Sequence, residues 1–117
     1  MTPLEVLKGA RALISEPSRW TRYACARDRH GLAVFSCSEA AVCWCLDGAV
    51  RKIAYGNNWK YSDAGKQLGL VMSIRPILNK ATNSQEFTDW QDAHTHAEVL
   101  SMLDQTIANL EGQPCSR

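Results

Sequence analysis

The stretch F-S-C-S-E-A-A-V-C-W-C-L-D-G-A-V, residues 35–50, gathers three cysteines and a tryptophan in sixteen positions. Ser36 and Glu39, three residues apart, have the pattern of a capping box, in which two side chains satisfy free backbone donors at a helix start. We therefore expect a helix that begins near Ser36 and contains the rest of the stretch. With a turn of about 100° per residue, Trp44 lies on the polar face of this helix, beside Asp47. The apolar face of the predicted helix consists of Val42, Cys45, Leu46, Ala49, Val50 and Ile53.

The cysteines of this stretch do not suit a metal site on a helix. Cys43 and Cys45 are two positions apart, so they point about 200° away from each other, and the C-x-x-C pairs of zinc sites are missing. Cys45 is predicted to be a small core residue. Cys37 lies at the expected helix start, where the helix N-terminus lowers the pKa of a thiol, and it is a candidate nucleophile with a histidine as base. The histidines for that role are His30, His94 and His96.

The sequence before this stretch predicts a helix and a β-hairpin. Residues 2–5 form a capping box with a proline in the first turn, and Pro17 closes the helix. Two short runs, residues 20–27 and 32–36, flank the polar, glycine-ending turn at 28–31, which is the pattern of a hairpin. Because an isolated hairpin is only marginally stable, one of its faces must pack on helices.

The second half of the chain is predicted to be mainly helical. A third capping box, residues 95–98, opens a helix that ends at Gly112, and residues 113–117 are expected to be a frayed, flexible tail. Residues 1–112 therefore form a single α+β domain, a short antiparallel hairpin packed with four to five helices. The other predicted elements are a loop at 55–61, a helix from Ser62 or Asp63 to about Met72, a short helix at 77–80 after Pro76, a linker at 81–85 and an extended segment at 86–92.

The composition is that of an ordinary globular protein. The 117 residues are 45% hydrophobic and 21% charged, which suits one domain with its own core. No apolar run approaches the roughly 18 residues of a membrane helix, and the N-terminus does not resemble a signal peptide. The five cysteines are an odd number and favour free thiols over a disulfide framework. We therefore expect a cytoplasmic protein that does not contact membranes.

The net charge of +1 hides an asymmetry along the chain. Residues 1–83 hold twelve Lys and Arg against six Asp and Glu, whereas residues 84–111 hold six acids and no Lys or Arg. Either the acidic segment folds back on the basic part, or the surface is dipolar and steers a charged partner. We favour the first interpretation.

Two further patterns suggest a metal site and a DNA-binding motif. His94 and His96, with Asp92 and Glu98 nearby, are residue types that zinc prefers, but a helix that starts at Thr95 separates them. Residues 65–74 faintly resemble a helix-turn-helix, yet the second helix would contain Pro76, which breaks helices, and its basic content is low for nucleic-acid binding. We expect neither a metal nor another cofactor, and nucleic acid is the less favoured partner.

A third pattern is a cluster of arginines and aromatic residues. Arg22, Arg27 and Arg29 surround the predicted hairpin, where they suit an acidic or phosphate ligand or pair with the acidic segment. Trp44, Trp59 and Tyr61 lie on a polar helix face or near a loop. Exposed aromatic and arginine side chains make up the energetic centres of protein interfaces. These six residues are therefore the candidate binding site.

The order of these motifs resembles that of a family of small bacterial and phage proteins described only as a domain of unknown function. The shared patterns are an N-terminal amphipathic helix, W-x-x-x-x-x-A-R-D at residues 20–28, W-C-x-x-G-A at 44–49, and W-x-D followed by T-H-A-E-V-L at 90–92 and 95–100. Gln91 stands where that family tends to have asparagine. The resemblance implies a common fold and brings no activity.

These observations give three hypotheses for function. The favoured one is a non-enzymatic, protein-binding regulatory module, such as a phage or mobile-element accessory or an anti-defence inhibitor, with a protein partner or a second copy of the chain. The first alternative is a small thiol- or metal-dependent enzyme that uses Cys37 or His94 and His96. The second alternative is a DNA-binding regulator.

Overall fold

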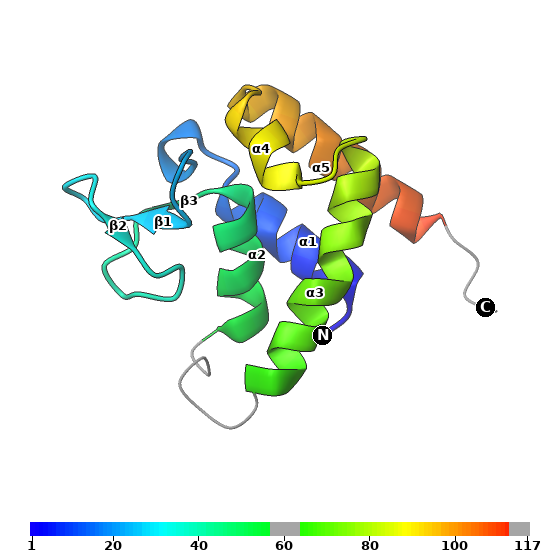
Figure 1. Cartoon of the computed structure of the whole chain (residues 1–117), viewed down its shortest axis with the longest axis horizontal. Helices are drawn as coiled ribbons and strands as arrows, with labels where there is room; N and C mark the ends of the chain where they lie inside the picture. Colours follow the sequence, from blue (N-terminus) through cyan, green and yellow to red (C-terminus); the bar gives the residue numbers. More distant parts are fainter. Residues whose placement is uncertain (57–63, 113–117) are drawn as a thin grey trace.

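The computed structural model describes residues 1–56 and 64–112, which form five α-helices and a small three-stranded sheet (Figure 1). This confirms the predicted α+β class, with its antiparallel hairpin and helices in one domain. The elements in chain order are α1 (Pro3–Leu13), the 3₁₀ helix η1 (Pro17–Arg19), β1 (Ala26–Arg27), β2 (Ala33–Val34), β3 (Cys43–Trp44), α2 (Leu46–Tyr55), α3 (Ala64–Ala81), α4 (Phe87–Asp92) and α5 (His96–Glu111).

Helix α1 is the centre of the helical layer. It packs against α2, α3 and α5, and α2 packs in turn against α3. The sheet stands at one end of the molecule, on the side of α2 that faces away from α3 (Figure 1). Val6, Leu7 and Ala10 of α1 are fully buried, as is Ile14, the residue that follows the helix.

The first and third predicted capping boxes are present. The Thr2 hydroxyl accepts from the backbone N–H of Glu5, and the Glu5 carboxylate accepts from the N–H of Thr2. Thr95 and Glu98 make the same reciprocal contacts at the start of α5. Each box satisfies two backbone donors that the helix itself leaves free, and both helix starts were therefore predicted correctly.

The predicted hairpin is confirmed, and a third strand joins it. β1 lies in the middle of the sheet, antiparallel to β2 on one side and to β3 on the other. The hairpin turn is fixed by Asp28, whose carboxylate accepts from the N–H groups of His30 and Leu32. Gly31 has a φ of 80°, a conformation that glycine adopts without steric cost.

The predicted helix start at Ser36 is wrong. Residues 36–42 form turns, and Cys43–Trp44 pair with the open edge of β1. The Ser38 hydroxyl accepts from the N–H of Ala40, a local contact that competes with helix formation. Helix α2 begins only at Leu46, with Cys45 as its N-cap: the thiol sulfur accepts from the N–H of Gly48.

The region predicted as a helix that ends near Met72 and a separate short helix at 77–80 is one helix, α3. Val71, Ile74 and Leu78 are fully buried on one face, whereas Pro76 is exposed. Burial of this continuous stripe offsets the roughly 3 kcal/mol that proline costs inside a helix. Because α3 runs through Gly69 without a turn, the helix-turn-helix interpretation of this segment is wrong as well.

The segment predicted to be extended, residues 86–92, is largely the short helix α4. Phe87 and Gln91 are four positions apart and both buried, which a helix achieves by placing them on one face. The Asn79 side chain accepts from the N–H of Phe87 at 2.9 Å and so satisfies a donor at the start of α4.

The acidic C-terminal segment folds back on basic residues, as favoured from the sequence. Lys8 and Arg11 of α1 pair with Glu111 and Asp104 of α5 at 2.7 and 2.8 Å. These are exposed contacts, each worth at most about 1 kcal/mol. Among the helices of residues 1–56 and 64–112, none has the length and apolarity to cross a membrane.

Candidate functional site

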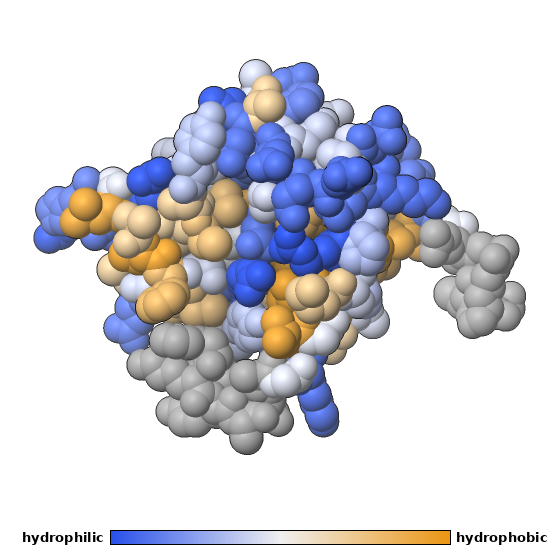
Figure 2. Space-filling view, in the orientation of Figure 1, coloured by the Kyte–Doolittle hydropathy of each residue, from blue (hydrophilic) through white to orange (hydrophobic). Residues whose placement is uncertain are grey.

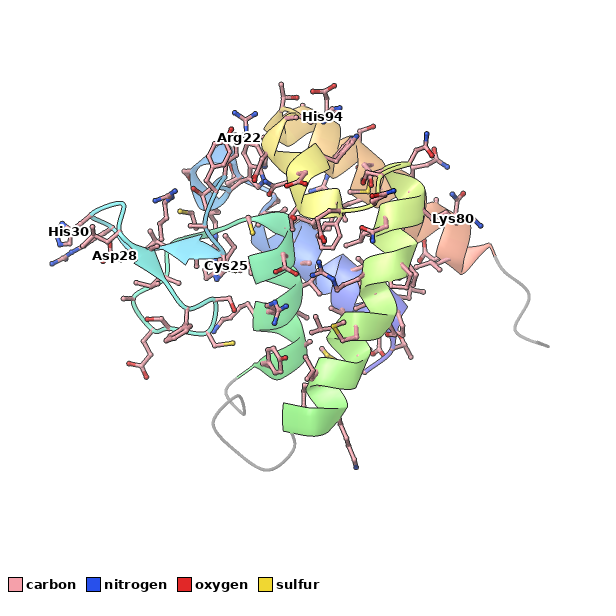
Figure 3. The ribbon with its side chains drawn as sticks, in the orientation of Figure 1. Arg22, Cys25, Asp28, His30, Lys80 and His94 are labelled. Atoms are coloured by element: carbon pink, nitrogen blue, oxygen red, sulfur yellow. The ribbon has the colours of Figure 1, made fainter. Side chains whose placement is uncertain are left out.

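A hollow of about 1030 Å³ opens between the hairpin and the helices α2 and α3. Residues 23–25 and 33–38 form its hairpin side, and side chains of α2 and α3 form the opposite wall. Apolar side chains gather over this end of the molecule (Figure 2). Cys25 lies between the sheet and α2, facing that helix (Figure 3).

The rim of the hollow carries large apolar side chains that are open to solvent. Tyr23 is 78% exposed, Phe35 75% and Leu68 46%. Tyr23 also has a φ of 66°, which is rare for a bulky residue and persists only where the surrounding structure fixes the backbone. Its N–H donates to the Asp92 carboxylate at 3.3 Å. The fold therefore holds an aromatic ring outward at the mouth of the hollow.

The α2 side of the hollow is polar. Arg51 and Arg75 both donate to the carboxylate of Asp47, at 3.1 and 3.2 Å, and Arg75 also donates to Glu86. Asp47 and Arg51 are four positions apart on α2, the spacing at which opposite charges pair along one helix face. Asp47 is only 8% exposed, and two guanidinium partners compensate the cost of burying its charge.

Two thiols meet beside the hollow, and one of them, Cys25, lines it. Cys25, just before β1, and Cys45, just after β3, continue the antiparallel register of these strands, and the Cys45 N–H donates to the Cys25 carbonyl at 3.1 Å. Cys25 is exposed, and Cys45 is buried. A hydrogen bond from the Cys45 thiol lowers the pKa of Cys25 to about 7. The same shared proton and burial raise the pKa of Cys45, so Cys25 is the thiol that ionises.

Gly48 makes this arrangement possible. A Cβ atom at Gly48 would lie 1.8 Å from the carbonyl oxygen of Cys25, far inside contact distance. Only glycine lets the first turn of α2 approach the strand that closely. The backbone of Cys25 is therefore held against the end of α2 that carries Cys45.

The candidate nucleophile Cys37 does not have the environment predicted for it. It lies in the turns before β3 rather than at a helix start, so the helix dipole does not act on it. Its sulfur contacts the main-chain oxygen of Arg51 at 4.0 Å. It lines the same hollow as Cys25.

The two candidate metal ligands have separate structural contacts. His94 stacks on the Trp90 ring at 4.0 Å, and its Nδ1 lies 2.6 Å from the Trp90 main-chain oxygen. His96 Nε2 lies 2.6 Å from the main-chain oxygen of Ile14. In residues 1–56 and 64–112, no group of three or more His, Cys, Asp and Glu is placed to hold a metal ion. The geometry does not support the zinc alternative.

The hairpin arginines are mostly occupied within the fold. Arg22 donates to the main-chain oxygen of His94, and its guanidinium lies 4.9 Å from the Trp20 ring centroid. Arg27 donates to a hydroxyl and two main-chain oxygens and so braces the hairpin. Arg29 is exposed at the turn and contacts only the neighbouring His30 ring in the described chain. It is the hairpin arginine best placed to meet a partner.

Of the three aromatic residues in the candidate binding site, Trp44 lies in the described part of the chain. Trp44 is 5% exposed, and its indole N–H donates to the main-chain oxygen of Ser36 at 2.8 Å. Its predicted place on an exposed helix face is wrong, because it belongs to a strand whose side chains enter the core. Trp59 and Tyr61 lie outside the described residues.

Sequence reasoning missed the importance of Cys25, Phe35 and Leu68. No local signal set these apolar residues apart: Phe35 ends the apolar run 32–35, and Leu68 lies between Gln67 and Gly69. The pairing of Cys25 with Cys45 depends on the third strand, which sequence reasoning placed in a helix.

Residues 1–109 match the family described as "Family of unknown function (DUF6197)". The match covers most of the chain, so the protein belongs to this family, as the resemblance of its motifs indicated. No curated protein and no solved structure matches the chain significantly.

Proposed function

We propose that the protein is a non-enzymatic binding module that docks a protein partner at the apolar hollow between the hairpin and α2. The observation that carries the proposal is the group of exposed apolar side chains, Tyr23, Phe35 and Leu68, around a concave surface. Large apolar side chains around a pocket are typical of interaction sites, where burial on binding supplies most of the energy.

The polar groups around the hollow define the chemistry of the partner. The apolar rim suits an aromatic or branched aliphatic side chain inserted from the partner. Arg29, exposed at the hairpin turn, suits an acidic residue beside that anchor. The expected ligand is therefore a protein surface or segment in which an apolar anchor lies next to Asp or Glu.

The α3 helix offers a matched pair of substitutions to test this site. Leu68 and Met72 are one turn apart and similarly exposed, at 46% and 53%, but only Leu68 lines the hollow. Because both are surface positions, Leu68→Glu and Met72→Glu should each change stability by no more than about 0.5 kcal/mol. A difference between them in binding then reports on the hollow itself.

Two readouts apply to this pair. The first is fluorescence of the apolar dye anilinonaphthalene sulfonate, which should bind to wild type and Met72→Glu and lose most of its signal with Leu68→Glu. The second is quantitative affinity capture from native cells, with proteins retained by wild type and Met72→Glu but lost with Leu68→Glu. Equal behaviour of the two variants in both assays refutes the proposal.

Native mass spectrometry of the full chain separates two kinds of partner. A concentration-dependent dimer that Leu68→Glu dissociates would identify a second copy of the chain as the occupant. A monomer that retains a captured protein supports a heterologous partner. The narrower roles of a phage accessory or anti-defence inhibitor, and a cytoplasmic location, remain hypotheses that the identity of that partner would test.

A further inference from the structure

A pair of thiols, one of which lines the hollow, supports an inference that is independent of protein docking. Cys25 and Cys45 are opposite each other in the extended register of β1 and β3, with a backbone hydrogen bond between them. Residues paired in this way across antiparallel strands have Cα atoms about 5.5 Å apart. That Cα separation lies within the range that a disulfide bond spans, and formation of the bond brings the two Cβ atoms from about 5 Å to about 4 Å apart.

The two thiols differ in the way that an attacking and a resolving thiol must differ. Cys25 is exposed and lines the hollow, so a small molecule reaches its sulfur from solvent. Cys45 is buried behind it, and its sulfur already accepts from the N–H of Gly48. That N–H, together with the positive end of the α2 dipole, stabilises negative charge on the Cys45 sulfur when Cys25 no longer shares its proton.

We propose that Cys25 and Cys45 form a redox-active dithiol that exchanges with low-molecular-weight disulfides entering the hollow. The thiolate of Cys25 attacks one sulfur of the disulfide RSSR; the S–S bond breaks, RS⁻ leaves, and a mixed disulfide forms on Cys25. Cys45 then loses its proton and attacks the Cys25 sulfur, and the second RS⁻ leaves. The protein dithiol is oxidised to a Cys25–Cys45 disulfide, and RSSR is reduced to two RSH, which take up the two protons.

The other groups around Cys25 fit this chemistry. Asp47 and Arg51 of α2 face Cys25 with opposite charges: the carboxylate raises the pKa of the thiol, and the guanidinium lowers it. The Cys45 hydrogen bond is the largest influence: it outweighs burial and the Asp47 carboxylate, which raise the pKa, and brings the pKa of Cys25 to about 7. Arg51 also lines the hollow and offers a cation to the carboxylates of a disulfide such as oxidised glutathione.

The test uses the reduced full chain, oxidised glutathione as the disulfide, and intact-mass measurement followed by peptide mapping. Wild type should lose two hydrogen atoms and yield a linked peptide that contains Cys25 and Cys45. Cys45→Ser should instead accumulate one glutathionyl group on Cys25, because the resolving thiol is gone. Cys25→Ser should react at Cys45 at least ten-fold more slowly, since the buried thiol is then left without its exposed partner.

Cys43→Ser is the control, because Cys43 is a free, half-buried thiol that contacts the main-chain oxygen of Arg27 at 4.0 Å and is not among the residues that line the hollow. It should form the Cys25–Cys45 link at the wild-type rate. Three results would overturn the proposal: glutathione distributed equally over Cys25, Cys37 and Cys43; a stable adduct on Cys25 of wild type; or no reaction at Cys25. Peptide mapping of the wild-type protein alone detects each of these three results, so the conclusion does not depend on how well a Cys45 variant folds.

Discussion

Gln91 is the buried residue whose replacement tests the fold most directly. Its side chain is 1% exposed, and its Oε1 accepts from the Trp20 indole N–H at 2.9 Å and from the backbone N–H of Leu46 at 2.8 Å. One oxygen thus ties the segment after η1, the first turn of α2 and α4 together. We predict that Gln91→Met, which keeps the length of the side chain and removes the acceptor, is strongly destabilising.

The size of the effect follows from the two donors left behind. The N–H of Leu46 is buried and the indole N–H of Trp20 partly buried. A buried donor without an acceptor costs about 1–3 kcal/mol, and the partly buried indole N–H is counted at the lower end, about 1 kcal/mol, so the two together should cost about 2–4 kcal/mol. For a domain of this size that lowers the unfolding midpoint by about 8–16 °C.

The measurement is chemical and thermal unfolding followed by circular dichroism. Gln105→Met is the matched control, because Gln105 is exposed on α5 and, within residues 1–56 and 64–112, donates only to the Asn109 side chain at 3.2 Å. It should change the free energy of unfolding by no more than about 0.5 kcal/mol. If Gln91→Met costs less than about 1 kcal/mol, the Gln91 oxygen does not hold the three segments together and the reasoning is wrong.

Three further outcomes follow from the geometry. Gly48→Ala should lower the free energy of unfolding by more than about 3 kcal/mol, because the new Cβ meets the main-chain oxygen of Cys25. Gly69→Ala, with open space around its Cβ, should instead raise it by about 1 kcal/mol, because alanine favours helix α3 more than glycine does. Urea unfolding distinguishes the two variants. Thr95→Ala should cost about 1 kcal/mol through loss of the cap, and it should raise the pKa of Glu98, which the Thr95 backbone and side chain now lower. Because the pKa of Glu98 is lowered in the folded state, the Glu98 carboxylate stabilises the fold above the ordinary pKa of 4.5, and this stabilisation is lost as the pH falls. The variant should therefore lose less stability on acidification than wild type, which unfolding measured at several pH values would reveal. The rate at which iodoacetamide alkylates Cys25 should have its pH midpoint near 7 rather than near the ordinary thiol value of 9.0. At pH 7 this rate should exceed that of an ordinary thiol by roughly six-fold, because about fifty-fold more thiolate is offset by about eight-fold lower nucleophilicity. A midpoint near 9 contradicts the shared proton.

Elements with local signals were predicted correctly from the sequence. The capping boxes at residues 2–5 and 95–98 act within one turn of chain, so the residues that decide the helix start are neighbours in sequence. The hairpin turn at 28–31 is equally local, since Asp28 and Gly31 supply its hydrogen bonds and its left-handed backbone.

The errors have a common cause in contacts between distant segments. Residues 86–92 are largely helical because a helix buries both Phe87 and Gln91 against other elements. Helix α3 continues through Pro76 because its apolar stripe is buried on both sides of the proline. In each case burial of side chains outweighs the local preference of the backbone. A single sequence does not reveal which helix and strand surfaces pack against each other in the fold.

The same error concealed the candidate site. In a helix from Ser36, Cys43 and Cys45 point to opposite sides and no thiol meets another. Because Cys43–Trp44 instead pair with β1, Cys45 is brought opposite Cys25, and residues 36–38 line the hollow. Gly48, three residues after Cys45, then becomes the sequence signal for the thiol pair: a glycine in the first turn of α2 is needed only if another backbone lies against it. Helix propensity alone disfavours glycine there, so its presence in the first turn is explained by the contact with Cys25 and not by the helix.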